Sequence, residues 1–249
     1  MRRILAKSRN ILRDLRRSPK QNVPSFPNEA VNFEKQVIFI AIPKTGTTTV
    51  RSQIRGRGTP LIPNPHLDIM QVRDTLYVYF LKRALGRNTT FPTESIPADS
   101  DLRGRAQQVF DTFFKFSGVR NPWARAVSLF FRREGVQLRD RISFEDFCER
   151  HLYASDTCRQ PTLHKNQLDW LCDENGRCVM DYVYKVENFA SAVKEIEERT
   201  EGRLRLVNSV KNRNPYSQSR HYRELHSDRT RKIIAARFQK DIDYFQYTF

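Results

Sequence analysis

The sequence lacks the features that mark membrane-spanning, secreted and zinc-stabilised proteins. Its 249 residues contain no apolar run of the length that crosses a bilayer, and the first residues lack the apolar core of a signal peptide. No cysteine has histidine or cysteine neighbours at the spacing of a zinc finger or ribbon. We therefore expect a cytoplasmic protein with no structural metal.

Cysteine itself is scarce in the chain. The four cysteines are Cys148, Cys158, Cys172 and Cys178. The last two flank an Asn175-Gly176 pair, which is a strong hairpin signal. A hairpin of the right register would place these two thiols opposite each other, so a disulfide between them is one alternative. Because the cytoplasm keeps thiols reduced, we favour packing cysteines without a disulfide.

Acidic residues are also scarce relative to basic ones. The chain has 44 Lys and Arg against 28 Asp and Glu, which gives a formal net charge of +16. A charge of this size implies an anionic partner: a nucleic acid, an acidic membrane surface, or a polyanionic ligand or glycan. On charge alone, a non-enzymatic nucleic-acid-binding protein is one alternative, and it predicts salt-sensitive binding to DNA or RNA.

Part of the positive charge lies in residues 1–36, which we interpret as a basic arm and linker before a domain of residues 37–249. Residues 2–20 contain eight Lys and Arg and a single acidic residue, Asp14. Several apolar residues of the arm lie near one face of a possible helix, so peripheral contact with an anionic membrane is one alternative. We favour a helix that packs on its own domain or a disordered tail.

The most informative segment is an apolar run followed by a threonine-rich loop. Residues 37–42 are rich in β-branched side chains, which predicts a buried parallel strand. A helix-forming stretch follows the loop, so the N–H groups of the helix start face whatever the loop encloses. These groups, a lysine charge and the threonine hydroxyls favour a bound phosphate. The candidate ligands are Lys44, Thr45, Gly46, Thr47, Thr48 and Thr49.

The spacing of this loop differs from that of the nucleoside triphosphatases. Their loop reads G-x-x-x-x-G-K-[ST], with lysine after the second glycine. Here Lys44 precedes Gly46, and position 41 is alanine rather than glycine. A kinase-like phosphoryl transferase, which is the second alternative, would need that lysine and a carboxylate for Mg²⁺. Residues 43–49 instead resemble the 5′-phosphosulfate loop of sulfotransferases that use 3′-phosphoadenosine-5′-phosphosulfate (PAPS).

A second motif supports the same resemblance. Residues 113–119 predict another buried strand, and Asn121 and Pro122 are a favourable N-cap and first residue for the helix that follows. Arg120 therefore lies at the carboxyl end of a strand, where ligands bind in open α/β sheets. Arg120 and Ser128, two helical turns later, resemble the 3′-phosphate site of the same sulfotransferases. An arginine fork and a hydroxyl are suitable donors to phosphate.

The resemblance is closest to the carbohydrate 2-O-sulfotransferase branch and its bacterial relatives, and it covers residues 37–249. Softer matches lie in segments 164–171, 181–189 and 241–249. The resemblance implies one α/β domain with a mainly parallel central sheet flanked by helices, a P-loop-like sulfotransferase fold. It also implies in-line transfer of a sulfuryl group from PAPS, without a metal, to an acceptor hydroxyl on a carbohydrate. No specific nucleic-acid partner is expected.

Sulfuryl transfer needs a base for the acceptor proton and a cation for the bridging oxygen that leaves. Lys44 is suited to the second task, and His66 is the first candidate for the base. His66 precedes a predicted helix start, where Asp68 and Gln71 have capping-box spacing. The positive helix end would keep the imidazole neutral, as a base must be. His164 or a carboxylate is the alternative base.

A basic loop is predicted late in the chain, at residues 211–217. Sulfotransferases commonly close such a loop over the nucleotide. By this resemblance Lys211 and Arg213 are further candidates to contact the 3′-phosphate.

Overall fold

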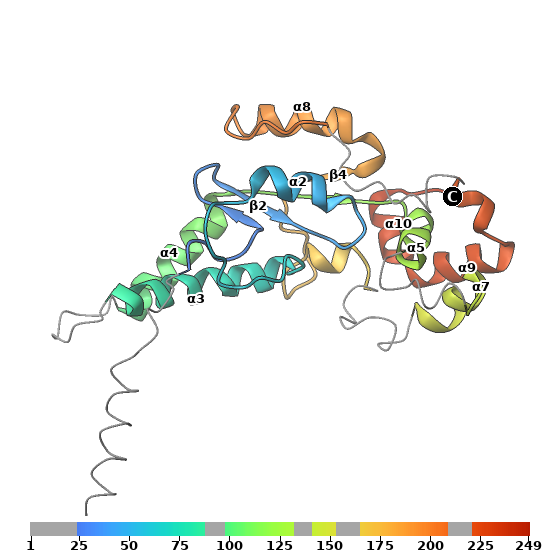
Figure 1. Cartoon of the computed structure of the whole chain (residues 1–249), viewed down its shortest axis with the longest axis horizontal. Coiled ribbons are helices and arrows are strands. Elements are labelled where there is room, and N and C mark those ends of the chain that lie inside the picture. The colour runs from blue at the N-terminus through green and yellow to red at the C-terminus, as the bar shows by residue number, and fades with distance from the viewer. Residues whose placement is uncertain (1–23, 88–97, 132–140, 153–164, 209–220) are drawn as a thin grey trace, which may run out of the picture.

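A central sheet contains the two strands that precede the threonine-rich loop and Arg120, and these strands are neighbours (Figure 1). The computed structural model describes residues 24–87, 98–131, 141–152, 165–208 and 221–249. Within these ranges four strands lie side by side in chain order: β1 (Val31–Asn32), β2 (Val37–Ile40), β3 (Phe114–Val119) and β4 (Tyr182–Lys185). β1 pairs antiparallel with β2, whereas the β2–β3 and β3–β4 pairs are parallel. The prediction of an α/β fold with a mainly parallel sheet is confirmed.

Helices cover both faces of the sheet, because β2 is apolar on both sides. Ile38 and Ile40 pack into one hydrophobic cluster, and Val37 and Phe39 pack into the other. This alternation follows from the two-residue period of a strand. The first cluster includes residues of α3 (Ile69–Arg87) and α4 (Asp99–Thr112), and the second includes residues of α2 (Thr47–Ile54) and α8 (Phe189–Arg199). Figure 1 shows these two pairs of helices on opposite sides of the sheet.

Beyond the ends of β2, β3 and β4, the remaining helices gather on the side of the carboxyl terminus (Figure 1). We call the edge at which these three strands end the carboxyl edge, and the opposite edge the amino edge. The helices labelled there are α5 (Pro122–Phe130), α7 (Phe144–Asp146), α9 (Asp228–Arg237) and α10 (Gln239–Phe245). The described residues also form the short helices η2 (Phe147–His151), η5 (Leu168–Trp170), η6 (Val186–Asn188) and η8 (Tyr222–Leu225). α5 packs against both η8 and α9.

Residues 24–36 belong to the folded domain, so the boundary predicted at residue 37 is too late. Phe26 and Val31 are buried, and β1 supplies the antiparallel edge of the sheet. The Asn32 side chain donates a 2.6 Å hydrogen bond to the carbonyl of Ile54 at the end of α2. These contacts join residues that are distant in the chain. The local composition, which is polar and contains Pro, does not reveal them and therefore suggested a linker. The predicted basic arm up to residue 23 lies outside the described residues.

The hairpin predicted around Asn175-Gly176 is present. Cys172 and Cys178 face each other across it, and Gly176 adopts a φ of 77° in the turn. Both residues are free thiols, as is the buried Cys148, in agreement with the favoured expectation, whereas Cys158 lies outside the described residues. Among the helices that the structure describes, none is long and apolar enough to cross a membrane.

Candidate active site

The loop between β2 and α2 presents an uncapped helix start at the carboxyl edge. Lys44 and Gly46 adopt φ values of 69° and 71°, in the left-handed region that bends the chain sharply. Gly46 is the N-cap of α2 and supplies no side-chain hydrogen bond to the N–H groups of the first turn. A left-handed lysine costs on the order of 1 kcal/mol, and such strain is concentrated at functional sites. The start of α2 therefore favours a bound anion.

The four threonines of this loop differ in burial and in the hydrogen bonds of their hydroxyls. The Thr45 hydroxyl donates a 3.0 Å hydrogen bond to the carbonyl of Ile42 and is buried, so it fixes the loop from within. Thr47 and Thr49 are buried in the first turn of α2, whereas Thr48 is exposed. Thr48 is therefore the threonine whose hydroxyl is most accessible to a ligand, and Thr45 offers a ligand only its backbone.

Arg120 brings the second motif against the first. It is the first residue beyond β3, and its Nη1 lies 3.4 Å from the carbonyl oxygen of Lys44. No carboxylate of the described residues forms an ion pair with it. Burial lowers the pKa of Arg120, and the negative charge of Glu187 opposes that shift. A desolvated cation without a paired carboxylate favours the binding of an anion.

Ser128 is placed differently from every other residue of α5. All the other residues of this helix are buried, and Ser128 is half-buried. Asn121 begins the helix as predicted, since its side-chain oxygen accepts hydrogen bonds from the backbone N–H groups of Trp123 and Ala124. The Ser128 hydroxyl makes no hydrogen bond to a described residue, so its donor is available to a ligand.

His66 lies against the strand that leads into the loop. Its Nδ1 is 2.7 Å from the carbonyl oxygen of Ala41, three residues before Lys44. Because a carbonyl only accepts hydrogen bonds, Nδ1 carries the proton of the neutral ring, and Nε2 keeps a lone pair. Burial lowers the pKa of His66, and the nearby charges of Arg51 and Lys44 lower it further. The lowered pKa favours the neutral form of the ring, and burial rather than the helix end is its main cause.

The capping box predicted after His66 is present. The backbone N–H of Asp68 donates to the Gln71 side chain at 3.0 Å, and the Gln71 N–H donates to the Asp68 carboxylate at 2.9 Å. The second oxygen of Asp68 pairs with Nζ of Lys165 at 3.1 Å. The box therefore fixes the start of α3, and the ion pair joins this segment to residues 165–168.

Arg125 is a buried residue of the site to which the sequence analysis assigned no role. Its Nε donates to the carbonyl of Pro43 at 3.2 Å, and its Nη1 donates to the carbonyl of Lys165 at the same distance. Burial lowers its pKa to about 10, and Asp241 opposes that shift. The sequence feature that could have indicated Arg125 is a charged residue among the apolar positions of a short helix. His164, Lys211 and Arg213, by contrast, lie outside the described residues.

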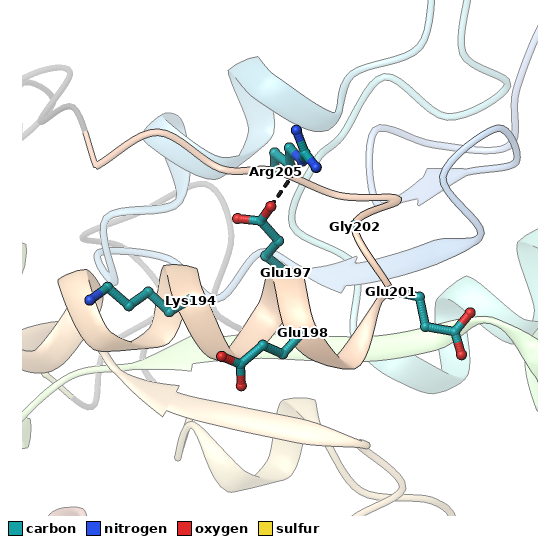
Figure 2. A pocket seen from close by; sticks show the side chains of 6 residues that line it. All are labelled: Lys194, Glu197, Glu198, Glu201, Gly202 and Arg205. Atoms are coloured by element: carbon teal, nitrogen blue, oxygen red, sulfur yellow. Dashed lines mark ion pairs between the residues drawn. The ribbon is translucent and has the colours of Figure 1, made fainter.

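A surface hollow on α8 has no part in this site (Figure 2). It is lined by Lys194, Glu197, Glu198, Glu201, Gly202 and Arg205. Next to it Arg203 bonds to the Gln36 side chain before β2, so the hollow lies toward the amino edge. Its carboxylates outnumber its cations, and Glu197 already pairs with Arg205 at 2.9 Å. An anionic ligand would be repelled there rather than held.

Comparison with known proteins identifies the family of this chain. Residues 27–248 match the sulfotransferase family, which is nearly the whole chain. The chain therefore belongs to the sulfotransferase family and is a sulfotransferase. Searches of curated proteins and of solved structures give no significant match. The match begins at residue 27, in agreement with the packing of residues 24–36 into the domain.

Proposed function

We propose that this sulfotransferase moves a sulfuryl group from PAPS to a hydroxyl of a saccharide. The observation that carries the proposal is the meeting of two anion-binding motifs at one edge, with Arg120 Nη1 3.4 Å from the Lys44 carbonyl. PAPS has anionic groups at both its 5′ and 3′ positions, so it needs two such sites. The family match supports sulfuryl transfer in general.

The residues present fit this donor. The uncapped first turn of α2, with the backbone of residues 45–49 and the Thr48 hydroxyl, would hold the 5′-phosphosulfate in a P-loop-like manner. Arg120 and Ser128 would hold the 3′-phosphate, because among the described residues Arg120 has no carboxylate partner and the Ser128 hydroxyl makes no hydrogen bond. Lys211 and Arg213 remain proposed contacts of the same phosphate.

The chemistry proposed for this site has His66 as the base. Its Nε2 takes the proton from the acceptor hydroxyl as the hydroxyl oxygen attacks sulfur. The bond between sulfur and the bridging oxygen breaks in line, and Lys44 stabilises the charge on that oxygen as 3′,5′-bisphosphoadenosine leaves. The hydrogen bond from His66 Nδ1 to the Ala41 carbonyl holds the ring in the tautomer that this role requires.

A saccharide acceptor is proposed from the likeness to the carbohydrate 2-O-sulfotransferase branch and from the net charge of +16. The phosphoryl-transferase alternative is less well supported, because Thr47 rather than lysine follows the loop glycine. Nothing in the described site favours base-specific contacts to nucleic acid over a small anionic ligand.

The proposal is tested with purified protein and PAPS labelled in its sulfuryl group. Acceptors would include unsulfated glycosaminoglycans, neutral oligosaccharides, phenols and lipid alcohols, each without added Mg²⁺. We expect transfer to a saccharide, with loss of transfer in Lys44→Ala. Transfer only to phenols or lipids would overturn the saccharide assignment. Absence of both transfer and 3′,5′-bisphosphoadenosine binding, with tight binding of Mg-ATP, would overturn the donor assignment.

A further inference from the structure

The side chain of Gln167 contacts both polar groups of the Arg120 main chain. Its Oε1 accepts the Arg120 N–H at 2.8 Å, and its Nε2 donates to the Arg120 carbonyl, also at 2.8 Å. Arg120 is the first residue beyond β3, where the sheet hydrogen bonds have ended. The amide thus takes the place of a neighbouring strand and fixes the peptide groups on both sides of the Arg120 Cα.

Asp241 on α10 determines which way this amide points. Its Oδ2 accepts from the Gln167 backbone N–H at 2.8 Å and from Gln167 Nε2 at 3.2 Å, and its Oδ1 accepts from the Leu168 N–H at 2.9 Å. A carboxylate only accepts, so Nε2 must face Asp241 and Oε1 must face Arg120. Asp241 is fully buried, and Arg125 provides the nearby positive charge.

Arg125 joins the same group to the other anion site. It is itself buried, and it donates to the carbonyl of Pro43, the residue directly before Lys44. It also donates to the carbonyl of Lys165, two residues before Gln167. Segment 165–168 is therefore bonded to both motifs, to the loop through Arg125 and to the end of β3 through Gln167.

We propose that Arg125, Gln167 and Asp241 form a buried brace that fixes the separation of the two anion sites. The brace selects a nucleoside with phosphates at both the 3′ and 5′ positions over one with a single phosphate. This inference rests on the proposed function, because it assumes that the loop and Arg120 hold the two ends of one nucleotide. The physical reason is preorganisation: once one phosphate is bound, the second contact is intramolecular and its cost in ordering is small.

The experiment compares two ligands on wild-type protein and on Gln167→Met. Calorimetry would give the affinities for 3′,5′-bisphosphoadenosine and for adenosine 5′-phosphate. For wild type we expect the bisphosphate to bind roughly 10- to 100-fold more tightly, the factor that one charge-assisted contact contributes. In Gln167→Met we expect that ratio to fall to about threefold or less while adenosine 5′-phosphate binds nearly as before.

Two further variants keep the result interpretable. Gln167→Asn keeps an uncharged amide but shortens the side chain by one methylene, so it cannot contact both polar groups of the Arg120 main chain and should lose the preference as well. Gln239→Met, on the same helix as Asp241, removes an exposed amide bonded to Asp243 and should keep the full preference. Thermal unfolding without ligand shows which variants are folded. If Gln167→Met does not fold, the ligand preference of Gln167→Asn decides the question.

A double mutant separates positioning from general loosening. If Gln167 acts through Arg120, Arg120→Ala combined with Gln167→Met should bind the bisphosphate no more weakly than Arg120→Ala alone. Additive losses, equal losses for both ligands, or an unchanged preference in the Gln167 variants would each overturn the brace. Failure of wild type to prefer the bisphosphate would instead overturn the proposed donor sites, so the two failures are distinguishable.

Discussion

Replacing His66 tests the proposed base most directly. The ring donates one hydrogen bond, from Nδ1 to the Ala41 carbonyl, and in the proposed mechanism Nε2 takes the acceptor proton. His66→Ala removes both, and we expect turnover to fall by roughly two to four orders of magnitude, or about 3–5 kcal/mol of barrier. Loss of the hydrogen bond alone should lower the free energy of unfolding by about 0.5–1.5 kcal/mol. Affinity for 3′,5′-bisphosphoadenosine should be nearly unchanged.

His66→Asn separates these two effects. Its side-chain amide can donate to the Ala41 carbonyl from nearly the position of Nδ1, but it cannot act as a base. This variant should therefore retain most of the stability and still lose turnover. His221→Ala is the matched control, because His221 is exposed, and its ring accepts a 3.4 Å hydrogen bond from the backbone N–H of Arg223 and contacts the neighbouring Tyr222 ring. The His221→Ala variant should retain the turnover of the wild type.

The pH dependence provides an independent measurement. Burial lowers the pKa of His66, so kcat/KM in wild type should fall on acidification with a midpoint below 6.5. The folded protein also binds fewer protons at this residue than the unfolded chain, so stability should decrease as the pH falls through 6.5. That decrease should be smaller in His66→Ala. Near-wild-type turnover in His66→Asn, or a midpoint above 6.5, would refute the reasoning.

Three further predictions concern the anion sites and the sheet. Arg120→Ala should weaken binding of 3′,5′-bisphosphoadenosine by about 1.5–3 kcal/mol, and Ser128→Ala by about 0.5–1.5 kcal/mol, and unchanged affinity by calorimetry would remove the 3′-phosphate assignment. Lys44→Ala should raise the KM for PAPS and lower kcat together, whereas a change in KM alone would argue against charge stabilisation in the transition state. Gly118→Ala should lower the free energy of unfolding by about 1–3 kcal/mol in urea, because the new methyl would lie 2.7 Å from the buried Tyr184 ring; a smaller loss would mean that the ring moves aside.

Much of the local structure followed from the sequence, because it depends on residues close in the chain. The buried strand that contains Phe39, the N-cap at Asn121, and the capping box that begins at Asp68 all depend on residues within a few positions of one another. The hairpin at Gly176 belongs to the same class. Chemistry at this range is independent of the rest of the fold, so these elements could be predicted from spacing and residue type.

The site itself was decided by the tertiary structure. Arg120 and the Lys44 carbonyl are 76 residues apart in the chain, and Gln167 and Arg120 are 47 apart. The sequence indicated which residues suit an anion, but the parallel pairing of β2 with β3 brings the two motifs to one edge. The sequence likewise could not reveal that the Thr45 hydroxyl bonds to the Ile42 carbonyl, or that burial is the main cause of the lowered pKa of His66. Such contacts depend on which strands are neighbours and how the chain packs over them, and local propensity carries no information about either.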